Sequence, residues 1–574
     1  MKVWISAILD LFILNSAFSQ SANVTWGDEF KLRKGSTDLS VFYTDNTGIY
    51  LKESHSALKS YFVIGATLRE SASLVKLDKT LTEVYNNDFS KELKGKEFES
   101  FYFIKDKLYL LASDYSNKEK TITLFAALVD KSTGELSGDW VELTNWVKND
   151  KKEDVQFKAD YNADSSRMVL VSTILGREKN NFEIRQFDIN LRSLGKPVFI
   201  TNEFEQKLYT LEDVVYAYND NIVLVGREYE YQEGKKKKSK YLDFRNYNIR
   251  IYNDNGKMIK ELNTTINGKW LISTRVEQTP SRELVLAGFY SNTKRGKTNG
   301  LMVQRVNPAT GETISTSDKE LNTSMIVAAD DDNDDGDDDE SRKERKEREK
   351  FEKIQNEEDG FSKYYRFRKF ITATDGGIVI LAEEYESYRY TNSEYVTSRA
   401  GSGYWRTNEY QVYECGDIMM SKMEAASGNI SWLYVVPKLQ REVINIGFNG
   451  NGVSIADNSY FWSRFNWPFY AGIGVLPGNN TLTIVFNDNK ANKDVLQLGQ
   501  KVKRVSYFGK SDCFGITLNT GTGKYTRSLL FSNKDVPTAM PRLSSVLGRD
   551  MYLVGKEDRI LAKSKVAIAK VTVK

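Results

Sequence analysis

Two segments of this chain hold aromatic side chains at a density suited to binding apolar or flat ligand surfaces. The first group comprises Tyr460, Phe461, Trp462, Phe465, Trp467, Phe469 and Tyr470, and the second Tyr385, Tyr388, Tyr390, Tyr395, Tyr404 and Trp405. Arg389, Arg406 and Arg464 interleave with these rings. Tyr, Trp and Arg are frequent anchors in sugar, peptide and protein recognition. The predicted binding residues are Tyr388, Tyr390, Tyr404, Trp405, Trp462, Arg464 and Trp467. The alternative is that the rings only pack long loops onto the body of the protein.

An acidic segment matches the first half of a calcium-binding loop. Asp331, Asn333 and Asp335 alternate before Gly336, as oxygen ligands do when they converge on one ion. The twelfth position of the loop is Arg342 rather than a bidentate glutamate. Weak calcium binding and a solvated acidic loop both stay open, and no other cofactor is predicted.

Histidine and cysteine are too scarce for most metal and nucleophile chemistry. His55 is the single histidine, which excludes a multi-histidine metal site and leaves one residue for any serine–histidine triad. We expect it to be a surface or loop residue. Cys415 and Cys513 fall at equivalent positions of neighbouring repeats, and facing sheets pack about 10 Å apart. A disulfide needs closer Cα atoms, so the two cysteines are expected to stay unpaired.

Charge gives weaker information about function. The 78 acidic residues make some carboxylate pair inevitable, but spacing in sequence does not locate it. Lys235 to Lys238 is a basic run that suits a solvated loop or a patch for an anionic partner. The formal net charge of +3 comes from mixed charges, so nucleic acid is not an expected partner.

Eight repeats must position these side chains. Each repeat contains an apolar strand flanked by turns, which is the second strand of the unit. These strands begin at Ile49, Leu108, Met168, Ile222, Leu284, Ile378, Leu482 and Met551. The intervals approach the period of about 40–60 residues of propeller blades, with longer intervals where loops are inserted. The sequence predicts an all-β fold, a single β-propeller with eight four-stranded blades favoured over seven.

The ends of the chain carry two further signals. Val24 to Asp28 resembles the fourth strands of other repeats, and the last repeat has little room for its own fourth strand. We therefore expect the N-terminal segment to close the ring and cover a sheet edge. Residues 1–19 have the charge, apolar run and small residues of a cleaved signal peptide, without a lipoprotein cysteine. The propeller is then expected over 20–574, in the periplasm or outside the cell.

A charged insertion interrupts the repeats. Residues 322–360 contain an acidic run followed by alternating Lys, Arg and Glu. The part with alternating charges, 341–358, has no apolar stripe by which it could dock. We expect it to project from the ring between the fifth and sixth blades. No later segment is apolar enough to span a bilayer.

The sixth repeat resembles a known type of repeat. Asp417 to Met423, Ser427 to Trp432 and Val436 to Gln440 are similar to the strand, glycine turn and strand of uncharacterised exported propellers common in Bacteroidota. Thr133-Gly134 with Trp140 approximates the eight-bladed quinoprotein-like repeat, which also occurs in scaffolds of outer-membrane protein assembly. The missing adjacent cysteine pair argues against a quinone-dependent dehydrogenase.

These observations favour an exported, non-enzymatic binding or scaffold propeller that engages a protein or carbohydrate through aromatic loops on one face. Such a protein would be a monomer or part of an envelope complex. The alternative is a carbohydrate-active enzyme with a carboxylate pair in the central funnel.

Overall fold

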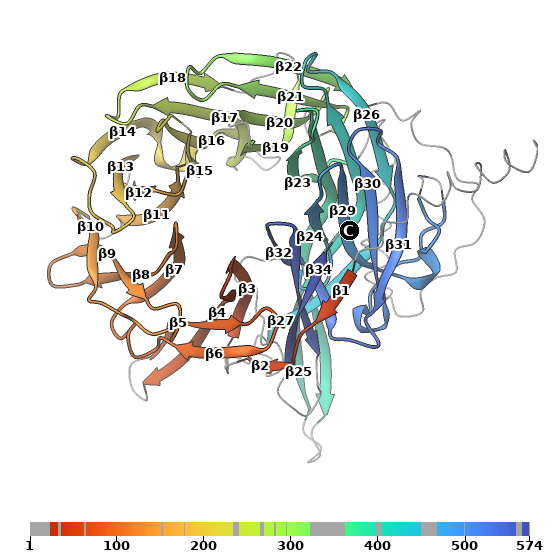
Figure 1. Cartoon of the computed structure of the whole chain (residues 1–574), viewed down its shortest axis with the longest axis horizontal. Helices are drawn as coiled ribbons and strands as arrows, with labels where there is room; N and C mark the ends of the chain where they lie inside the picture. Colours follow the sequence, from red (N-terminus) through yellow and green to blue (C-terminus); the bar gives the residue numbers. More distant parts are fainter. Residues whose placement is uncertain are drawn as a thin grey trace, which may run out of the picture.

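The apolar second and third strands of every repeat form the middle of a four-stranded antiparallel sheet, and eight such sheets surround a centre in the computed structural model (Figure 1). The structure describes residues 23–572 except 33–35, 62–64, 151–152, 163, 177, 218, 234–239, 264–268, 280–282, 294–295, 322–361, 398–402, 449–467, 497, 499 and 558–564. The predicted all-β fold with eight blades is confirmed, and the seven-bladed alternative is wrong.

Each blade runs from an inner strand beside the centre to an outer strand. Blades one to three are β3 (Ser36–Asp45), β4 (Gly48–Tyr61), β5 (Gly65–Leu77) and β6 (Glu83–Asp88); β7 (Glu97–Ile104), β8 (Lys107–Ser116), β9 (Thr121–Val129) and β10 (Val141–Val147); β11 (Asp154–Tyr161), β12 (Arg167–Leu175), β13 (Lys179–Asp188) and β14 (Val198–Glu205). Blades four and five are β15 (Tyr209–Tyr216), β16 (Ile222–Glu233), β17 (Lys240–Tyr252) and β18 (Met258–Asn263); β19 (Trp270–Gln278), β20 (Leu284–Ser291), β21 (Gly300–Val306) and β22 (Thr313–Glu320).

The remaining blades include two with an additional strand. Blade six is β23 (Tyr365–Thr372), β24 (Ile378–Thr397), β25 (Gly403–Met423) and β26 (Ile430–Val436), with β27 (Gln440–Phe448) pairing β25. Blade seven is β28 (Ile473–Pro477), β29 (Thr481–Asp488), β30 (Asp512–Asn519) and β31 (Tyr525–Ser532). Blade eight is β32 (Thr538–Leu547), β33 (Asp550–Glu557), β34 (Lys565–Thr572) and β1 (Asn23–Trp26), with β2 (Phe30–Lys31) also pairing β34. Short 3₁₀ helices are η1 (Gln206–Leu208), η3 (Lys490–Asn492) and η4 (Phe508–Lys510).

The middle strands are continuously apolar because a neighbouring blade covers each of their faces. In β20 all eight residues are buried. Leu284 and Leu286 pack toward blade four, whereas Val285, Ala287 and Phe289 pack toward blade six. Successive side chains of a strand point to opposite faces, so both sets must be apolar. The outer strand β18 is almost entirely exposed and mixes polar residues with apolar ones such as Met258 and Ile259.

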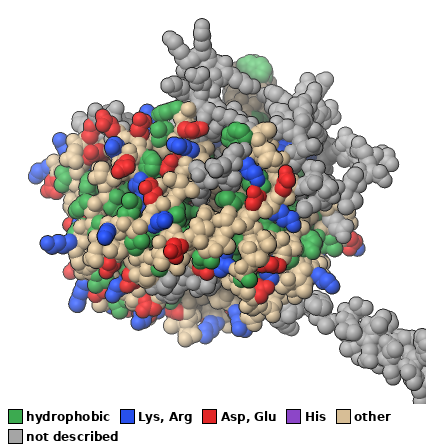
Figure 2. Space-filling model, turned by 90° about the horizontal axis from the view of Figure 1, so that it is seen from above, with side chains coloured by type: hydrophobic (Ala, Val, Ile, Leu, Met, Phe, Trp, Pro, Cys, Tyr) green, Lys and Arg blue, Asp and Glu red, His purple; other side chains and the backbone are tan. Residues whose placement is uncertain are grey.

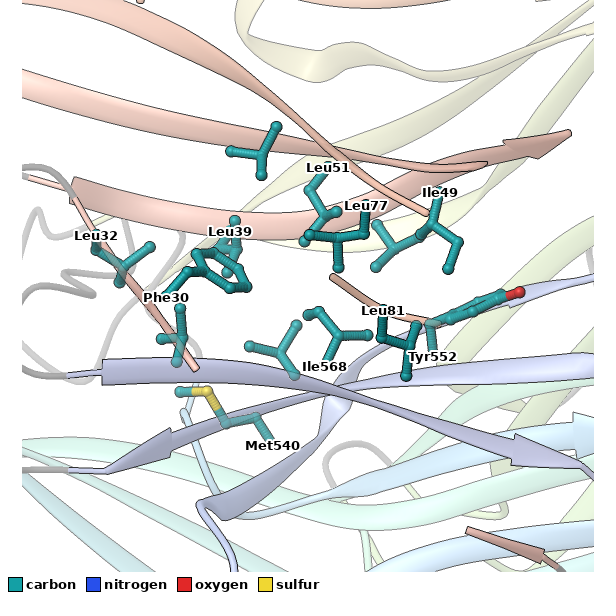
Figure 3. Close-up of a cluster of buried hydrophobic side chains, with 14 of the residues drawn as sticks. Phe30, Leu32, Leu39, Ile49, Leu51, Leu77, Leu81, Met540, Tyr552 and Ile568 are labelled. Atoms are coloured by element: carbon teal, nitrogen blue, oxygen red, sulfur yellow. The ribbon is translucent and has the colours of Figure 1, made fainter. Parts of the chain in front are cut away.

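The N-terminal segment closes the ring, as predicted. β1 pairs β34 in antiparallel register from Asn23 opposite Thr572 to Trp26 opposite Ala569. Figure 3 shows Phe30 from β2 within a buried cluster that joins the first blade to the last. The first described residues of the chain thus complete its last sheet and remove an open edge.

In five of the eight blades, a glycine at the turn between the third and fourth strands packs the blade on the preceding one. Gly134, Gly256, Gly311, Gly428 and Gly523 all have φ between 67° and 77°, a region that other residues rarely adopt. A Cβ atom on Gly311 would lie 2.4 Å from a side-chain carbon of Lys260 in the blade before it. The predicted glycine turns therefore fix the contact between blades as well as the hairpin.

Several predicted features lie partly outside the described residues. The leader over 1–19, the lysine run and the 322–360 insertion are outside them, although the insertion falls between β22 and β23, hence between blades five and six. In the part of the chain that the structure describes, no helix has the length and apolar character needed to cross a bilayer. Figure 2 shows positive and negative side chains mixed over the face seen from above, in keeping with the small net charge.

Candidate functional site

A recurring irregularity lies on the inner strands that border the centre of the ring. In β3, β7, β15, β19 and β23 the pairing with the second strand shifts by one residue, which leaves an extra residue in the inner strand. The extra residues are Phe42, Glu99, Glu212, Ile272 and Arg368. In β32 a longer shift, between Met540 and Ser545, contains Arg542. Such bulges re-aim side chains and are frequent beside active sites, so several blades place a charged side chain at an equivalent irregular position.

A pocket of about 610 Å³ opens between the inner strands of blades four to seven. Its charged lining comes from Glu212 and Asp213 on β15, Arg275 and Glu277 on β19, and Lys369 on β23. Its apolar lining is Val215, Val225, Val276, Phe370, Ile371 and Pro477. A concave site with apolar walls and a few converging polar groups is the usual form of a ligand site.

Burial changes the protonation of carboxyl groups on three consecutive inner strands. Desolvation raises the pKa of Glu99 on β7, Asp160 on β11 and Asp213 on β15. The negative charge of Asp213 further raises the pKa of Asp160. At Asp213 itself, the hydrogen bond from the Val214 N–H and the positive charges of Lys158 and Arg275 oppose the rise in pKa. Asp213 is exposed to water from the pocket, yet the surrounding concave protein surface limits its hydration. Raised pKa values in a concave site are typical of groups that transfer protons.

The other pocket carboxylates are held by cations and backbone groups. Arg275 donates to Glu277 Oε1, at 2.8 Å from its Nε, and the Phe370 N–H donates to Oε2 at 3.0 Å. Arg227 binds both oxygens of Glu212. Glu277 also ties blade five to blade six, since Phe370 belongs to β23. Two fixed carboxylates and one accessible carboxyl with a raised pKa therefore share the pocket.

The predicted aromatic residues lie on a long hairpin rather than in one site. Tyr388 and Tyr390 on β24 are half-buried, and Tyr390 stacks on Tyr410 with ring centres 5.0 Å apart. Trp405 on β25 is 69 % exposed and meets Tyr395, which is 58 % exposed, edge to face. Alternation along the paired strands places Trp405 on the opposite face of the hairpin from Tyr388 and Tyr390. These rings therefore lie on both faces of the hairpin, and the binding role predicted for them stays a prediction.

The remaining predicted site residues have different outcomes. The backbone of Tyr404 lies in β25 opposite Val396, and its side chain is outside the described part of the structure. Trp462, Arg464, Trp467, Asp331, Asn333 and Asp335 also lie outside it. Among the residues that the structure describes, no three His, Cys, Asp or Glu side chains come together as metal ligands would.

His55 is buried within β4, so the expected surface or loop position is wrong. The hairpin of β4 and β5 extends past the predicted strand end and includes it. The Nε2 atom lies 3.3 Å from Ser73 Oγ and 3.6 Å from Asp88 Oδ1. A catalytic triad places its serine and carboxylate on different ring nitrogens, whereas here both approach one.

The two cysteines lie in separate buried clusters. Cys415 on β25 packs with Ala471, Val505 and Phe508, and Cys513 on β30 packs toward blade eight. Burial raises the pKa of Cys415 to about 12 and raises the pKa of Cys513 as well. Both thiols are therefore protonated and shielded in the folded protein.

We predict that a thiol reagent such as DTNB will react slowly with the native protein and count two thiols per chain after unfolding without a reductant. Cys415→Ala should lower the count to one, which serves as the internal control. A count of zero in the unfolded monomer would contradict the placement of the cysteines in separate clusters.

A cluster of acidic groups lies at the base of the long hairpin. Desolvation, followed by the charges of Glu414 and Glu384, raises the pKa of Glu386 to about 8. Desolvation and the charge of Glu384 likewise raise the pKa of Asp417 to about 7. Protons bound here are stabilised by folding, because the same groups titrate near pH 4 in an unfolded chain.

Stability is therefore predicted to fall as the pH rises from 6 to 9. The raised pKa values contribute to the free energy of unfolding. This contribution is complete below about pH 4 and is lost as the pH rises through 7 and 8. Glu386→Gln should flatten this decline and raise stability at pH 9 by roughly 1 kcal/mol, a figure reduced for partial solvent screening. Urea unfolding at several pH values measures both effects, with exposed Glu312→Gln as the control. An unchanged pH slope in Glu386→Gln would contradict the assignment.

Sequence patterns missed the charged residues of the inner strands. Arg366, Arg368 and Lys369 lie in a short strand together with Tyr365 and Phe367. Three cations within such a strand were an available signal. Which of them occupies the bulge follows only from the pairing of β23 with β24.

Comparisons with known proteins give no family and only distant structural neighbours. No family model matches the chain, and no curated protein matches it in sequence. Among solved structures, the polysaccharide lyase Uly1 is 7 % identical, with coverage of 97 % of this chain and 98 % of that chain and a TM-score of 0.36. The propeller domain of the trilobed protease from Pyrococcus furiosus is 10 % identical, with 79 % and 100 % coverage and a TM-score of 0.27. Prolyl oligopeptidase B from Galerina marginata is 12 % identical, with a TM-score of 0.27; the match covers 64 % of this chain but only 37 % of that enzyme. All three TM-scores are below 0.5, so the eight-bladed fold is assigned from the sheet topology of this chain. The resemblance of the sixth repeat to exported propellers stays a prediction.

Proposed function

We propose that this protein is a carbohydrate-active enzyme whose site is the pocket in the centre of the ring. The observation that carries this proposal is the convergence of Glu212, Asp213 and Glu277 with apolar side chains in one concave space. A sugar presents both hydroxyl groups and apolar C–H faces, so it matches such a lining. The leader predicted over 1–19 makes export part of the proposal.

The proposed reaction is hydrolysis of a glycosidic bond by general acid–base catalysis. Asp213, whose pKa is raised by desolvation, donates its proton to the leaving oxygen. Glu277, whose carboxylate is held by Arg275 and by the Phe370 N–H, accepts a proton from the attacking water. The oxygen of that water bonds to the anomeric carbon as the glycosidic bond breaks. The two residues come from β15 and β19, so they approach the substrate from different blades.

The test is release of reducing sugar from soluble starch, xylan, arabinan, mannan and pectin. For a substrate that is cleaved, Asp213→Asn and Glu277→Gln should each lower kcat by about 10²–10⁴-fold. Trp405→Ala, at the exposed end of the hairpin, should leave kcat unchanged. Equal activity in Asp213→Asn and the unaltered protein would overturn the proposed roles, and no cleavage of any polysaccharide would count against the reaction.

A second candidate is a binding or scaffold protein that uses the end of the long hairpin. The exposed rings of Tyr395 and Trp405 favour it, because large exposed aromatic side chains often anchor partners. Under this alternative, Trp405→Ala should abolish binding of the same polysaccharides in affinity electrophoresis, whereas Asp213→Asn should not. The two variants thus separate the candidates.

A further inference from the structure

Two arginines from different blades meet over one tyrosine ring. The guanidinium carbons of Arg368 on β23 and Arg542 on β32 lie 5.2 and 5.3 Å from the ring centre of Tyr385. Both arginines come from the irregular positions of their inner strands. The same kind of irregular strand pairing that places Glu212 at the pocket therefore places an arginine on the inner strand of blade six and another on that of blade eight.

The carboxylate beside these arginines is already engaged. Glu383 Oε2 accepts a hydrogen bond of 2.6 Å from Arg368 Nε, and its Oε1 accepts one of 2.8 Å from Lys438. The charge of Glu383 also acts on Arg542, yet burial and the like charge of Arg368 lower the pKa of Arg542 to about 10. Arg368 and Arg542 therefore repel each other beside one carboxylate, Glu383, whereas Lys438 also lies close to Glu384 and Asp417.

Water reaches part of this cluster, although Arg368 Nη2 and Arg542 Nη1 are themselves buried. The side chain of Arg368 is 13 % exposed, and Arg542 and Tyr385 are partly exposed. Guanidinium groups offer several N–H donors in one plane, which match two oxygens of the same anion. An anion placed between the two arginines would relieve their repulsion and form charge-assisted hydrogen bonds with both.

We propose that Arg368 and Arg542, held against Tyr385, bind an oxyanion group of an anionic ligand: a carboxylate, sulfate or phosphate. This site shares no residue with the pocket lining, so its test is independent of the glycosidase proposal.

The experiment is isothermal titration calorimetry of the full chain with sodium sulfate, sodium phosphate and sodium glucuronate, each at constant ionic strength. Glucose is the neutral counterpart of glucuronate. We expect at least one anion to bind, and the anion that binds identifies the ligand group. Arg542→Gln should weaken its binding by about 10–100-fold, the loss of a charged hydrogen-bonding partner. Arg167→Gln removes an exposed positive charge that belongs to neither the pocket nor this cluster, and it should change the affinity less than twofold.

Folding of the variants is not expected to limit this test, since Arg542→Gln removes a like charge from a crowded cluster. If it fails to fold, Arg368→Lys keeps the charge but loses the planar fork, and it should weaken binding several-fold. The proposal is overturned if none of the three anions binds the unaltered protein. It is also overturned if every folded variant binds them as tightly as the unaltered protein.

Discussion

Lys438→Met is expected to cost the protein about 3–5 kcal/mol of stability, because it removes one partner of a buried ion pair. Lys438 and Glu383 are both 0 % exposed. The Lys438 ammonium donates to Glu383 Oε1 at 2.8 Å, to the Cys415 carbonyl at 3.0 Å and to Gln440 Oε1 at 2.7 Å. Although burial raises the pKa of Glu383, Lys438 and Arg368 hold it below its ordinary value. Without the lysine, a charged carboxylate stays buried with less compensation.

Urea unfolding measures this loss, and two further variants make it specific. Arg167→Met breaks an ion pair with Asp220 whose side chains are 45 % and 36 % exposed, so stability should change little. The double variant Lys438→Met with Glu383→Gln should be more stable than the sum of its single changes, because the uncompensated charge is gone. Equal losses in Lys438→Met and Arg167→Met would contradict the role assigned to burial.

Deleting residues 23–31 is expected to produce the other large effect, because it opens the ring. The deletion removes β1 and β2, leaving one edge of β34 without its partners. It also removes Phe30 from the buried cluster between the first and last blades. Loss of one buried aromatic side chain alone costs about 3 kcal/mol or more, and the exposed edge favours aggregation.

Because the deletion removes buried surface, thermal unfolding should show a melting temperature lowered by at least 10 °C. Otherwise, light scattering should show aggregation. Excision of 322–360, a longer segment that contains no described strand, is the matched control and should leave the melting temperature nearly unchanged. If both deletions behave alike, the N-terminal strand is not what secures the ring.

The sequence was sufficient for the blades and insufficient for the site. Strands such as the one that starts at Leu284 are apolar on both faces because a blade covers each face. This run of apolar residues can be read directly from the sequence of each repeat. The position of Glu212 at the pocket and that of Arg368 beside Tyr385 depend on which inner residue sits at a bulge. Glu212 and Arg368 are ordinary charged residues in sequence, and only the pairing shift distinguishes them.

Burial of single polar residues was equally hard to foresee. Three polar residues, Lys52 to Ser54, separate His55 from the apolar stretch, and the sequence does not reveal that the hairpin continues through it. Tyr388 and Trp405 were both recognised as aromatic candidates, but the hairpin register decides that they lie on opposite faces. Composition located the unusual segments, whereas strand pairing decided what their side chains can reach.

The pairing of Asn23 with Thr572 also sets an order of events for synthesis of the chain. β1 is made long before β34, so it must wait for nearly the whole polypeptide before it finds its partner. Contacts between residues so distant in sequence slow folding, because the connecting chain must be ordered first. Until that last strand arrives, seven blades have to persist as an open arc with two unsatisfied ends. Any factor that delays the final strand, including a stalled ribosome, would leave this arc available to pair with another copy.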